Sequence, residues 1–382
     1  MLRSTRVRKT TIIGTTLLAL LPISAMATNG ILPMGNGVAS MGMGGAGIAN
    51  AADAISVADN PALASKVSNS WSVGATLFNP NRSANVGNGY VDSDSNYFLI
   101  PQIGRIKKLN EKFAVGIVTT AMGGMNTDYP EELFGTRTGQ NLMGLIIAPT
   151  VSFKASEKVA IGASLLIGYE SLEFEGPGNG LPQNDKDDAW GLGLRVGLTA
   201  DVSPGTTLGF SAQTKVNMAE METHCDYMFA PIADDDCSLD LPAMVGVGIS
   251  TQVSDRVKLV GDVQRVYWEG VPLFGDQFGW EDQTVVKLGM EYKVSDGLAL
   301  RAGYNHGGSP IPEDKTMNAI LAPGIVEDHL TIGFAKKVKK GTLSGYYART
   351  LENEHEQSTN PAGLPSVKMN QNALGISYSV NF

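Results

Sequence analysis

The stretch Asn372-Ala373-Leu374-Gly375-Ile376-Ser377-Tyr378-Ser379-Val380-Asn381-Phe382 decides the fold class. In an extended strand one face carries Leu374, Ile376, Tyr378, Val380 and Phe382, and small or polar residues fill the other face. A transmembrane β-barrel needs such a strand to close it, because one face contacts lipid and the other lines a polar lumen.

The start of the chain predicts export. Arg3, Arg6 and other basic residues precede an apolar run over 12–21, and the small-residue site Ala25-Met26-Ala27 follows. This pattern is typical of a secretory signal peptide over 1–27, since the apolar run is too short for a spanning helix. Together the two ends predict a multi-pass β-barrel in the bacterial outer membrane.

Composition agrees with this and excludes another class. Charged residues are 18% of the chain and hydrophobic residues 43%, yet no later stretch approaches the ~18 consecutive apolar residues of a spanning helix. The apolar content is therefore spread over many short segments. The net charge is -9, and no basic cluster follows the signal, which excludes nucleic acid as a partner because phosphate binding rests on Lys and Arg.

Fourteen segments between residues 70 and 382 have a period-two character. They are 71–79, 96–106, 112–121, 142–154, 157–173, 188–202, 205–217, 241–254, 256–268, 283–295, 297–306, 328–338, 341–352 and 372–382. Short polar turns alternate with longer connectors between them, as in up-and-down barrels. We therefore expect an all-β fold, an antiparallel barrel of about fourteen strands over 70–382, with the longer connectors facing outward from the cell.

Individual strands sort into a lipid face and a lumen face. In 190–199 the expected outer face begins with Trp190 and Leu192, and in 286–294 it begins with Val286 and Leu288. Three cations, Arg195, Lys287 and Arg301, then fall on the inner face. They either pair with carboxylates across strands or meet the carboxylate of a ligand, and strand parity leaves both open.

Residues 28–69 differ from the barrel segments. They are rich in Gly, Ala and Met and nearly free of charge, with tight glycine runs such as 42–47. Small residues allow close backbone packing, so this segment is predicted to form a hatch that plugs the lumen.

The two cysteines, Cys225 and Cys237, lie in an acidic segment that includes 234–236. In an exported chain we expect a disulfide between them that holds one long loop. The alternative is a metal site with His224, which the mixture of hard oxygen and soft thiolate ligands disfavours. We expect no metal and no cofactor.

At this point the residues resemble a known family. The run 41–47, then Asp53-Ala54 and Asn60-Pro61-Ala62, then 240–243 and 301–304 followed by 309–312, resembles the FadL-type outer-membrane transporters of long-chain fatty acids and hydrocarbons. The resemblance covers the whole mature chain in the right order.

The resemblance implies a route for the substrate. A hydrophobic compound would be captured among the outer loops, pass to an apolar pocket and leave sideways through a gap made by an inward kink in the third strand. By that similarity Asn60, Pro61 and Ala62 lie at the junction of hatch and barrel near the gap, and Gly116 in the third strand is the candidate for the kink. Glycine permits a bulge, and proline has no N–H for a ladder.

Apolar residues in the outer connectors form the candidate capture surface. They are Met122, Met125, Leu133, Phe134, Met228, Phe229, Leu273, Phe274, Phe278, Trp280, Ile320 and Leu321.

The expected function is passive uptake of hydrophobic compounds, with long-chain fatty acids as the leading substrate. Aromatic or aliphatic hydrocarbons taken up by the same route are the alternative. Fatty acids would call for a cation near the pocket, whereas hydrocarbons would need none.

Two other classes compete with transport. An outer-membrane phospholipase would need a Ser/His pair, and the chain has four histidines and no G-x-S-x-G motif. A structural or adhesive barrel would not need a plug. The other expected partners are outer-membrane lipid and, as the resemblance implies, the barrel assembly machinery that recognises Phe382.

Overall fold

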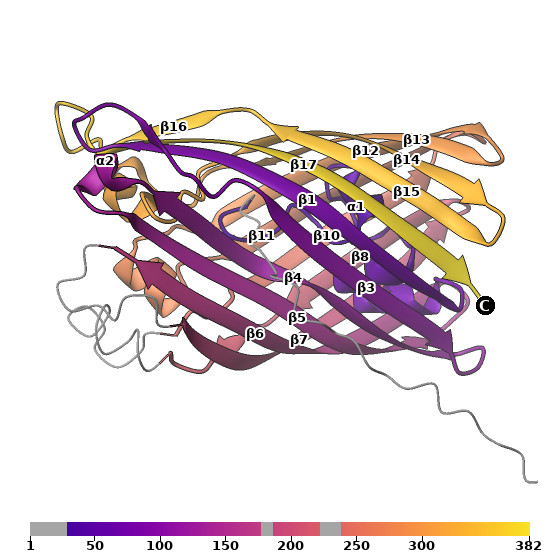
Figure 1. Cartoon of the computed structure of the whole chain (residues 1–382). Helices are drawn as coiled ribbons and strands as arrows, with labels where there is room; N and C mark the ends of the chain where they lie inside the picture. The colour runs from indigo at the N-terminus through magenta and orange to yellow at the C-terminus, as the bar shows by residue number, and fades with distance from the viewer. Residues whose placement is uncertain (1–28, 177–185, 222–237) are drawn as a thin grey trace, which may run out of the picture.

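The barrel predicted from the alternating segments is present in the computed structural model, which describes residues 29–176, 186–221 and 238–382 (Figure 1). The described part of the chain contains fourteen long antiparallel strands. They are β1 (Ser70–Asn85), β3 (Phe98–Lys108), β4 (Phe113–Tyr129), β5 (Thr138–Lys154), β6 (Val159–Glu175), β7 (Lys186–Ser203), β8 (Thr206–Gln213), β10 (Ala243–Gln252), β11 (Val257–Tyr267), β12 (Gln283–Ser295), β13 (Leu298–Gly307), β14 (Asp328–Val338), β15 (Gly341–Thr350) and β17 (Ser366–Asn381).

The first and last long strands close the barrel. β1 pairs with β17 along its whole length, from Ser70 opposite Asn381 to Asn85 opposite Ser366. Three short strands, β2 (Val91–Asp92), β9 (Asn217–Met218) and β16 (Asn353–Glu356), add local pairings to the same sheet. The predicted fold class, a fourteen-stranded antiparallel barrel, is confirmed.

The predicted division into two faces is also confirmed. Trp190 and Leu192 are 55% and 57% exposed, whereas Thr199 on the same strand is fully buried. On β12, Leu288 is exposed and Lys287 is buried. Large apolar side chains therefore cover the outside of the barrel, as contact with lipid requires.

Several strands run further than the alternating pattern predicted. The segment expected to end at residue 121 continues as β4 to Tyr129, and β1 continues to Asn85 rather than residue 79. In β4 the alternation of buried and exposed residues is lost at Met122-Gly123-Gly124. The sequence pattern therefore did not predict the outer half of this strand.

Aromatic pairs lie near the two ends of the barrel. Trp71 and Tyr378 pack edge-to-face with centroids 6.1 Å apart near the chain terminus, and Phe113 packs on Phe153 at 4.9 Å. Tyr169 and Trp190 form a similar pair toward the outer end. Such rings suit the two membrane–water interfaces.

Phe382→Ala is expected to reduce assembly of the barrel more than the stability of barrel already formed. The Phe382 ring is 58% exposed, and the Arg105 guanidinium lies over it, 5.5 Å from the ring centroid. Loss of this ring removes little buried area but alters the terminal feature expected to direct assembly. Two measurements check this: the amount of heat-modifiable, folded protein in the membrane, which should fall, and the thermal midpoint of that folded protein, which should change little. A normal amount of folded Phe382→Ala protein would contradict the prediction.

Residues 29–69 precede the first strand and are mostly buried. They contain α1 (Val38–Met41), η1 (Ala54–Ala58) and η2 (Pro61–Ser65), which Figure 1 shows among the strands that surround them. The Asp53 carboxylate caps η1 by accepting from Ile55 N, and Asn60 caps η2 by accepting from Ala62 N. We refer to residues 29–69 as the hatch.

Luminal side chains hold the hatch through its backbone. Asp262 Oδ2 accepts from Gly47 N at 2.7 Å and Ile48 N at 3.1 Å, and Thr331 Oγ1 accepts from Gly44 N at 3.0 Å. A Cβ on Gly303 would lie 2.0 Å from Gly44 N, so hatch and strand touch backbone to backbone there.

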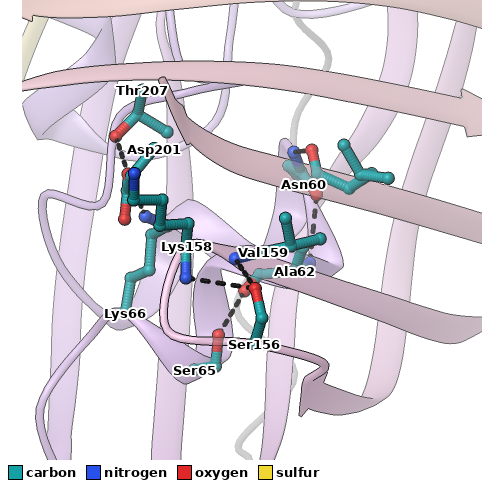
Figure 2. A network of polar contacts seen from close by, with 10 residues as sticks. Asn60, Ala62, Ser65, Lys66, Ser156, Lys158, Val159, Asp201 and Thr207 are labelled. Carbon is teal, nitrogen blue, oxygen red and sulfur yellow. Dashed lines mark hydrogen bonds and ion pairs between the residues drawn. The ribbon is translucent and has the colours of Figure 1, made fainter. Parts of the chain in front are cut away.

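At the end of the hatch, η2 packs on β5, β6 and β7. Figure 2 shows Ala62 and Lys66 of this segment with the residues around them. Ser152 Oγ donates to Ala62 O at 3.1 Å, and Lys66 Nζ lies 2.5 Å from Asp201 Oδ1. Figure 2 also shows Ser65 and Asn60, whose contacts stay within the hatch or reach β7.

Three short helical turns lie in the outer connectors: α2 (Glu131–Phe134), η4 (Pro272–Gln277) and η5 (Glu313–Ala319). Of the helices in the described residues, none has the length and apolar character needed to cross a membrane.

Candidate functional site

The ladder between β3 and β4 breaks partway along both strands. Its last pair is Ile103 with Thr119, although β4 continues to Tyr129. Within the described chain, residues 98–102 of β3 pair only with β1, so their β4-facing edge has no strand partner there. Pro101 lies in this stretch, where a residue without an N–H is tolerated.

A bulge in β4 coincides with the break. The pairing with β5 shifts between Ala121 and Gly123, which makes Met122 the extra residue. Gly123 has a φ of 149°, and Gly124 N donates to Ile31 O of the hatch at 3.2 Å. At Gly124 the backbone of β4 is therefore hydrogen-bonded to the hatch, beyond the point where its pairing with β3 ends.

The prediction that Gly116 forms the kink is wrong. Gly116 pairs regularly with Ile106 on one side and Thr150 on the other. The irregularity lies at residues 121–124, where Gly123 adopts a backbone conformation that other residues rarely take. The adjacent glycines in the sequence were the signal for this position.

A small cavity of about 20 Å³ adjoins the break. Its walls are residues 100–102 of β3, Thr120 and Ala121 of β4, and hatch residues that include Gly35 and Gly37. We call it the side cavity.

A second cavity of about 80 Å³, the luminal cavity, shares Thr120 and Ala121 with the side cavity. Arg195, Lys287 and Asp262 line it from the barrel, and Asp59 lines it from the hatch. This cavity is therefore polar on one side, with two cations facing two carboxylates.

A third cavity, the largest of the three at about 180 Å³, lies among the outer ends of the strands and the outer connectors. Its lining is mostly apolar, and we call it the outer cavity. It is lined by Met125, Gln140, Leu142, Leu172, Phe174, Leu239, Leu273, Phe274, Phe278, Met317, Asn318, Leu321 and Ala322.

The three cavities follow β4 inward. Met125 lines the outer cavity, Met122 the luminal cavity, and Thr120 both the luminal and side cavities. The bulge thus lies where an apolar outer pocket, a partly polar inner pocket and the unpaired edge of β3 meet.

An aromatic cluster packs against the start of the hatch beside the outer cavity. The centroid of Trp268 is 5.0 Å from that of Trp280 and 5.3 Å from that of Phe274. A Cβ on Gly30 would lie 2.9 Å from both tryptophan rings. Because Gly30 also has a φ of 67°, the hatch can approach these rings only with glycine there.

The three phenylalanines predicted to bind substrate do not all line a cavity in the structure. Phe274 and Phe278 line the outer cavity, whereas Phe134 sits on α2, 39% exposed, and lines none of the three cavities. Phe134 is therefore not brought to this site. The sequence pattern could not show this, since it placed all three only in outer connectors.

The predicted luminal cations also differ from one another. Arg195 and Lys287 line the luminal cavity, where Arg195 Nη1 donates to Ala58 O of the hatch. Arg301 instead pairs with Glu291, Nε to Oε2 2.8 Å. Of the two alternatives left open for these cations, Arg301 therefore shows cross-strand pairing.

Asn60, Pro61 and Ala62 lie where the hatch meets the barrel, but they are not at the β3–β4 break. Asn60 Nδ2 donates to Leu198 O of β7 at 3.1 Å, and a Cβ on Gly162 of β6 would lie 2.4 Å from the Pro61 carbonyl carbon. Their predicted position near the gap is wrong; Ile31 and residues 35–37 occupy that place in the hatch.

Cys225 and Cys237 lie outside the described residues, as do the signal segment 1–27, His224, Met228 and Phe229. The disulfide therefore stays a prediction. Across 29–176, 186–221 and 238–382, no group of three or more His, Cys, Asp or Glu side chains is placed to hold a metal ion.

Asp59 is the most unusual titratable group of the hatch. Burial raises its pKa from 3.8 to about 7, against the opposing effects of a hydrogen bond from Asn36 Nδ2 at 2.9 Å and the charge of Lys287. Asp262 raises this pKa further, and Arg195 lowers it. Docking of the hatch therefore favours the protonated form of Asp59.

We expect docking of the hatch to weaken between about pH 4 and pH 7. The docked state binds the Asp59 proton more tightly than an undocked, solvated state, so its stability falls as pH rises toward about 7, by roughly 4 kcal/mol in total. Hydrogen-exchange protection factors of residues 54–60 should follow this trend in wild type and lose it in Asp59→Asn. Asp255→Asn, in an exposed turn, is the control, and a wild-type profile flat with pH would contradict the assignment.

His306, near the outer end of β13, lies beside a carboxylate on the neighbouring strand β14. His306 Nδ1 lies 2.9 Å from Asp328 Oδ1, and Tyr304 donates to the same oxygen.

Sequence reasoning missed Arg82. It lies on the inner face of β1 with Phe78 and Pro80, is 5% exposed, and lies over the Phe98 ring at 5.7 Å. Alternate residues from Ser70 onward face inward on this strand, and continuing that alternation to residue 82 would have predicted Arg82 as an inner residue. The strand was instead expected to end at residue 79.

The fourteen antiparallel strands and their lipid-facing surface define a bacterial outer-membrane β-barrel. A family model described as outer membrane protein transport protein (OMPP1/FadL/TodX) matches residues 24–324. The chain belongs to this family, whose members are outer-membrane transport channels.

Individual relatives are distant in sequence. The 47 kDa outer membrane protein of Pasteurella multocida is 23% identical over 336 residues, which cover 74% of this chain and 78% of that protein. The crystal structure of a Pseudomonas aeruginosa FadL homologue matches with a TM-score of 0.73 at 16% identity, covering 93% of this chain and 100% of that one. The Pseudomonas putida toluene transporter TodX matches with a TM-score of 0.72 at 19% identity, covering 93% and 100%. These structural matches establish the fold.

Proposed function

We propose that this protein takes up hydrophobic compounds passively across the outer membrane, with long-chain fatty acids as the leading substrate. The compound enters the outer cavity, moves to the luminal cavity and leaves sideways between β3 and β4. The observation that carries the proposal is the end of the β3–β4 ladder at Ile103 and Thr119, beside a cavity and a bulge.

The physical reason for this route is the state of the substrate in water. Apolar surface left in water costs about 25 cal/mol per Å², so a wet pore is unfavourable for a long acyl chain. Apolar walls at Leu142, Phe274 and Phe278 favour capture, and the lipid outside β3 and β4 is the natural acceptor.

Monoaromatic hydrocarbons are the second candidate. Two observations favour them: the aromatic cluster of Trp268, Phe274 and Trp280 beside the outer cavity, and the similarity to the toluene transporter TodX. The route would be the same for either substrate.

Uptake by cells lacking their own transporter of this family tests the proposal. Cells expressing this chain should accumulate radiolabelled laurate or toluene faster than cells with an empty vector, without hydrolysing added phospholipid. Equal accumulation with and without the protein, at normal levels of folded barrel, would refute the function. Phospholipid hydrolysis by purified protein would instead support an enzyme.

A further inference from the structure

A buried cation, Arg82, lies beside the outer cavity and has no counter-charge among the described residues. Arg82 is 5% exposed, and its Nε and Nη2 atoms have no hydrogen-bond partner among the described residues. Arg82 also forms no ion pair with any residue of the described chain. The Phe98 ring under the guanidinium supplies no counter-charge and no acceptor for these N–H groups, and a buried charge without either is strongly unfavourable, so the position favours binding of an anion.

The geometry of the unpartnered atoms specifies the kind of anion. Nε and Nη2 form one edge of the planar guanidinium, and their N–H groups point the same way. This edge matches the two oxygens of a carboxylate, which it binds through two parallel hydrogen bonds. Neutral hydrocarbons gain nothing from it.

Arg82 faces a small cavity of about 10 Å³, whose walls include Phe78, Asn126, Met125 and Met369. This volume is close to what one water molecule needs. Methionine side chains are flexible, so Met125 and Met369 can shift to admit a carboxylate. The hydroxyl of Tyr129, which is also buried, lacks a hydrogen-bond partner in the described chain as well.

Met125 connects this position to the substrate route. It lines both the cavity at Arg82 and the outer cavity, and the neighbouring residues Ala322 and Pro323 divide between the same two cavities. A molecule with a carboxylate at Arg82 therefore has apolar space for its tail on the other side of Met125.

The luminal cations are less suited to this task. Arg195 already donates to Gln213 and Ala58, Lys287 faces the carboxylates of Asp262 and Asp59, and Arg301 is paired with Glu291. Of these and Arg82, only Arg82 has a whole guanidinium edge without a partner in the described chain.

We propose that Arg82 is the carboxylate-binding residue of this channel and selects fatty acids over neutral hydrocarbons of similar size. This inference rests on the proposed function and refines it to a substrate class. The bound molecule is an aliphatic carboxylate whose head group pairs with Arg82 and whose tail occupies the outer cavity.

The test compares laurate with 1-dodecanol, which has the same chain length and no charge. Equilibrium binding to full-length protein in detergent is measured for wild type, Arg82→Met and Arg82→Lys. Arg82→Met should weaken laurate binding at least about tenfold, because it removes charged hydrogen bonds, and leave dodecanol binding unchanged. Arg82→Lys, which keeps the charge and loses the bidentate edge, should be intermediate and covers the case in which Arg82→Met does not fold.

Arg349→Met is the matched control, since Arg349 lies on the outer face of β15 and is exposed. It should bind both ligands as wild type does. Unchanged laurate binding in Arg82→Met, or equal loss of laurate and dodecanol, would overturn the proposal.

Wild-type results separate this proposal from the function itself. Wild-type protein that binds and takes up toluene or dodecanol but not laurate would refute the role of Arg82 and leave the channel function standing. Wild-type protein that takes up none of the three would refute both.

Discussion

Deletion of Met122 is expected to stop uptake while leaving a folded barrel. Ala121 pairs with Leu145 and Gly123 with Gly144, so removal of the residue between them makes the β4–β5 ladder regular without changing any other pair. A regular β4 can extend its ladder with residues 98–102 of β3 and close the opening. We expect the initial rate of laurate or toluene uptake to fall at least roughly tenfold, in line with loss of the exit.

Gly116→Ala is the control for this deletion. Its Cβ would meet Arg105 O at 3.3 Å and Ile106 Cγ1 at 3.5 Å, contacts that small shifts relieve, and Gly116 lies in regular pairing. Its uptake should stay near the wild-type rate. Binding to the outer cavity, followed by tryptophan fluorescence, should persist in both variants. Normal uptake by a well-expressed Met122 deletion would rule out lateral exit at this bulge.

Gly303→Val is expected to displace the hatch and open the barrel to water-soluble molecules. A Cβ at this position would lie 2.0 Å from Gly44 N and 2.2 Å from the Met43 carbonyl carbon, both backbone atoms that cannot rotate away. Two adjacent hydrogen bonds should then be lost, the one that Asn305 Nδ2 donates to Gly44 O and the one that Gly44 N donates to Thr331 Oγ1. Single-channel conductance in planar bilayers should rise severalfold, and protease should cleave the hatch.

Gly308→Val supplies the comparison, because a Cβ there meets nothing within 4 Å. It should retain the wild-type conductance and protease resistance. If Gly303→Val kept low conductance and an intact hatch with a normal folded barrel, backbone contact at Gly44 would not be what seats the hatch.

Local patterns were sufficient for the barrel but not for the position of its irregularity. The strands over 190–199 and 286–294 sorted correctly because a lipid face and a lumen face impose strict alternation. The predicted strand ended at residue 121, although β4 continues to Tyr129, because a bulge interrupts the alternation there. The bulge, which is the feature most relevant to function, therefore marked the end of the predicted strand. Gly116 was chosen as a glycine in the right strand, and its regular pairing became visible only with the registers of β3 and β5.

The candidate site shows the same limit. Parity placed Arg195, Lys287 and Arg301 on the inner face, but only their contacts separate the paired Arg301 from the two cavity-lining cations. Phe274 and Phe278 reach the outer cavity and Phe134 does not, since connectors of similar composition fold in different directions.

The sequence by itself determined the all-β class, the strand number and the lipid-facing surface, because these depend on the order of apolar and polar residues along single strands. It also predicts the export signal. Only the tertiary structure decided where β3 and β4 part, which hatch residues lie beside that opening, and that Arg82 Nε and Nη2 have no hydrogen-bond partner in the described chain. Those features depend on contacts between residues far apart in the chain, and no local pattern encodes which buried polar group goes unpaired.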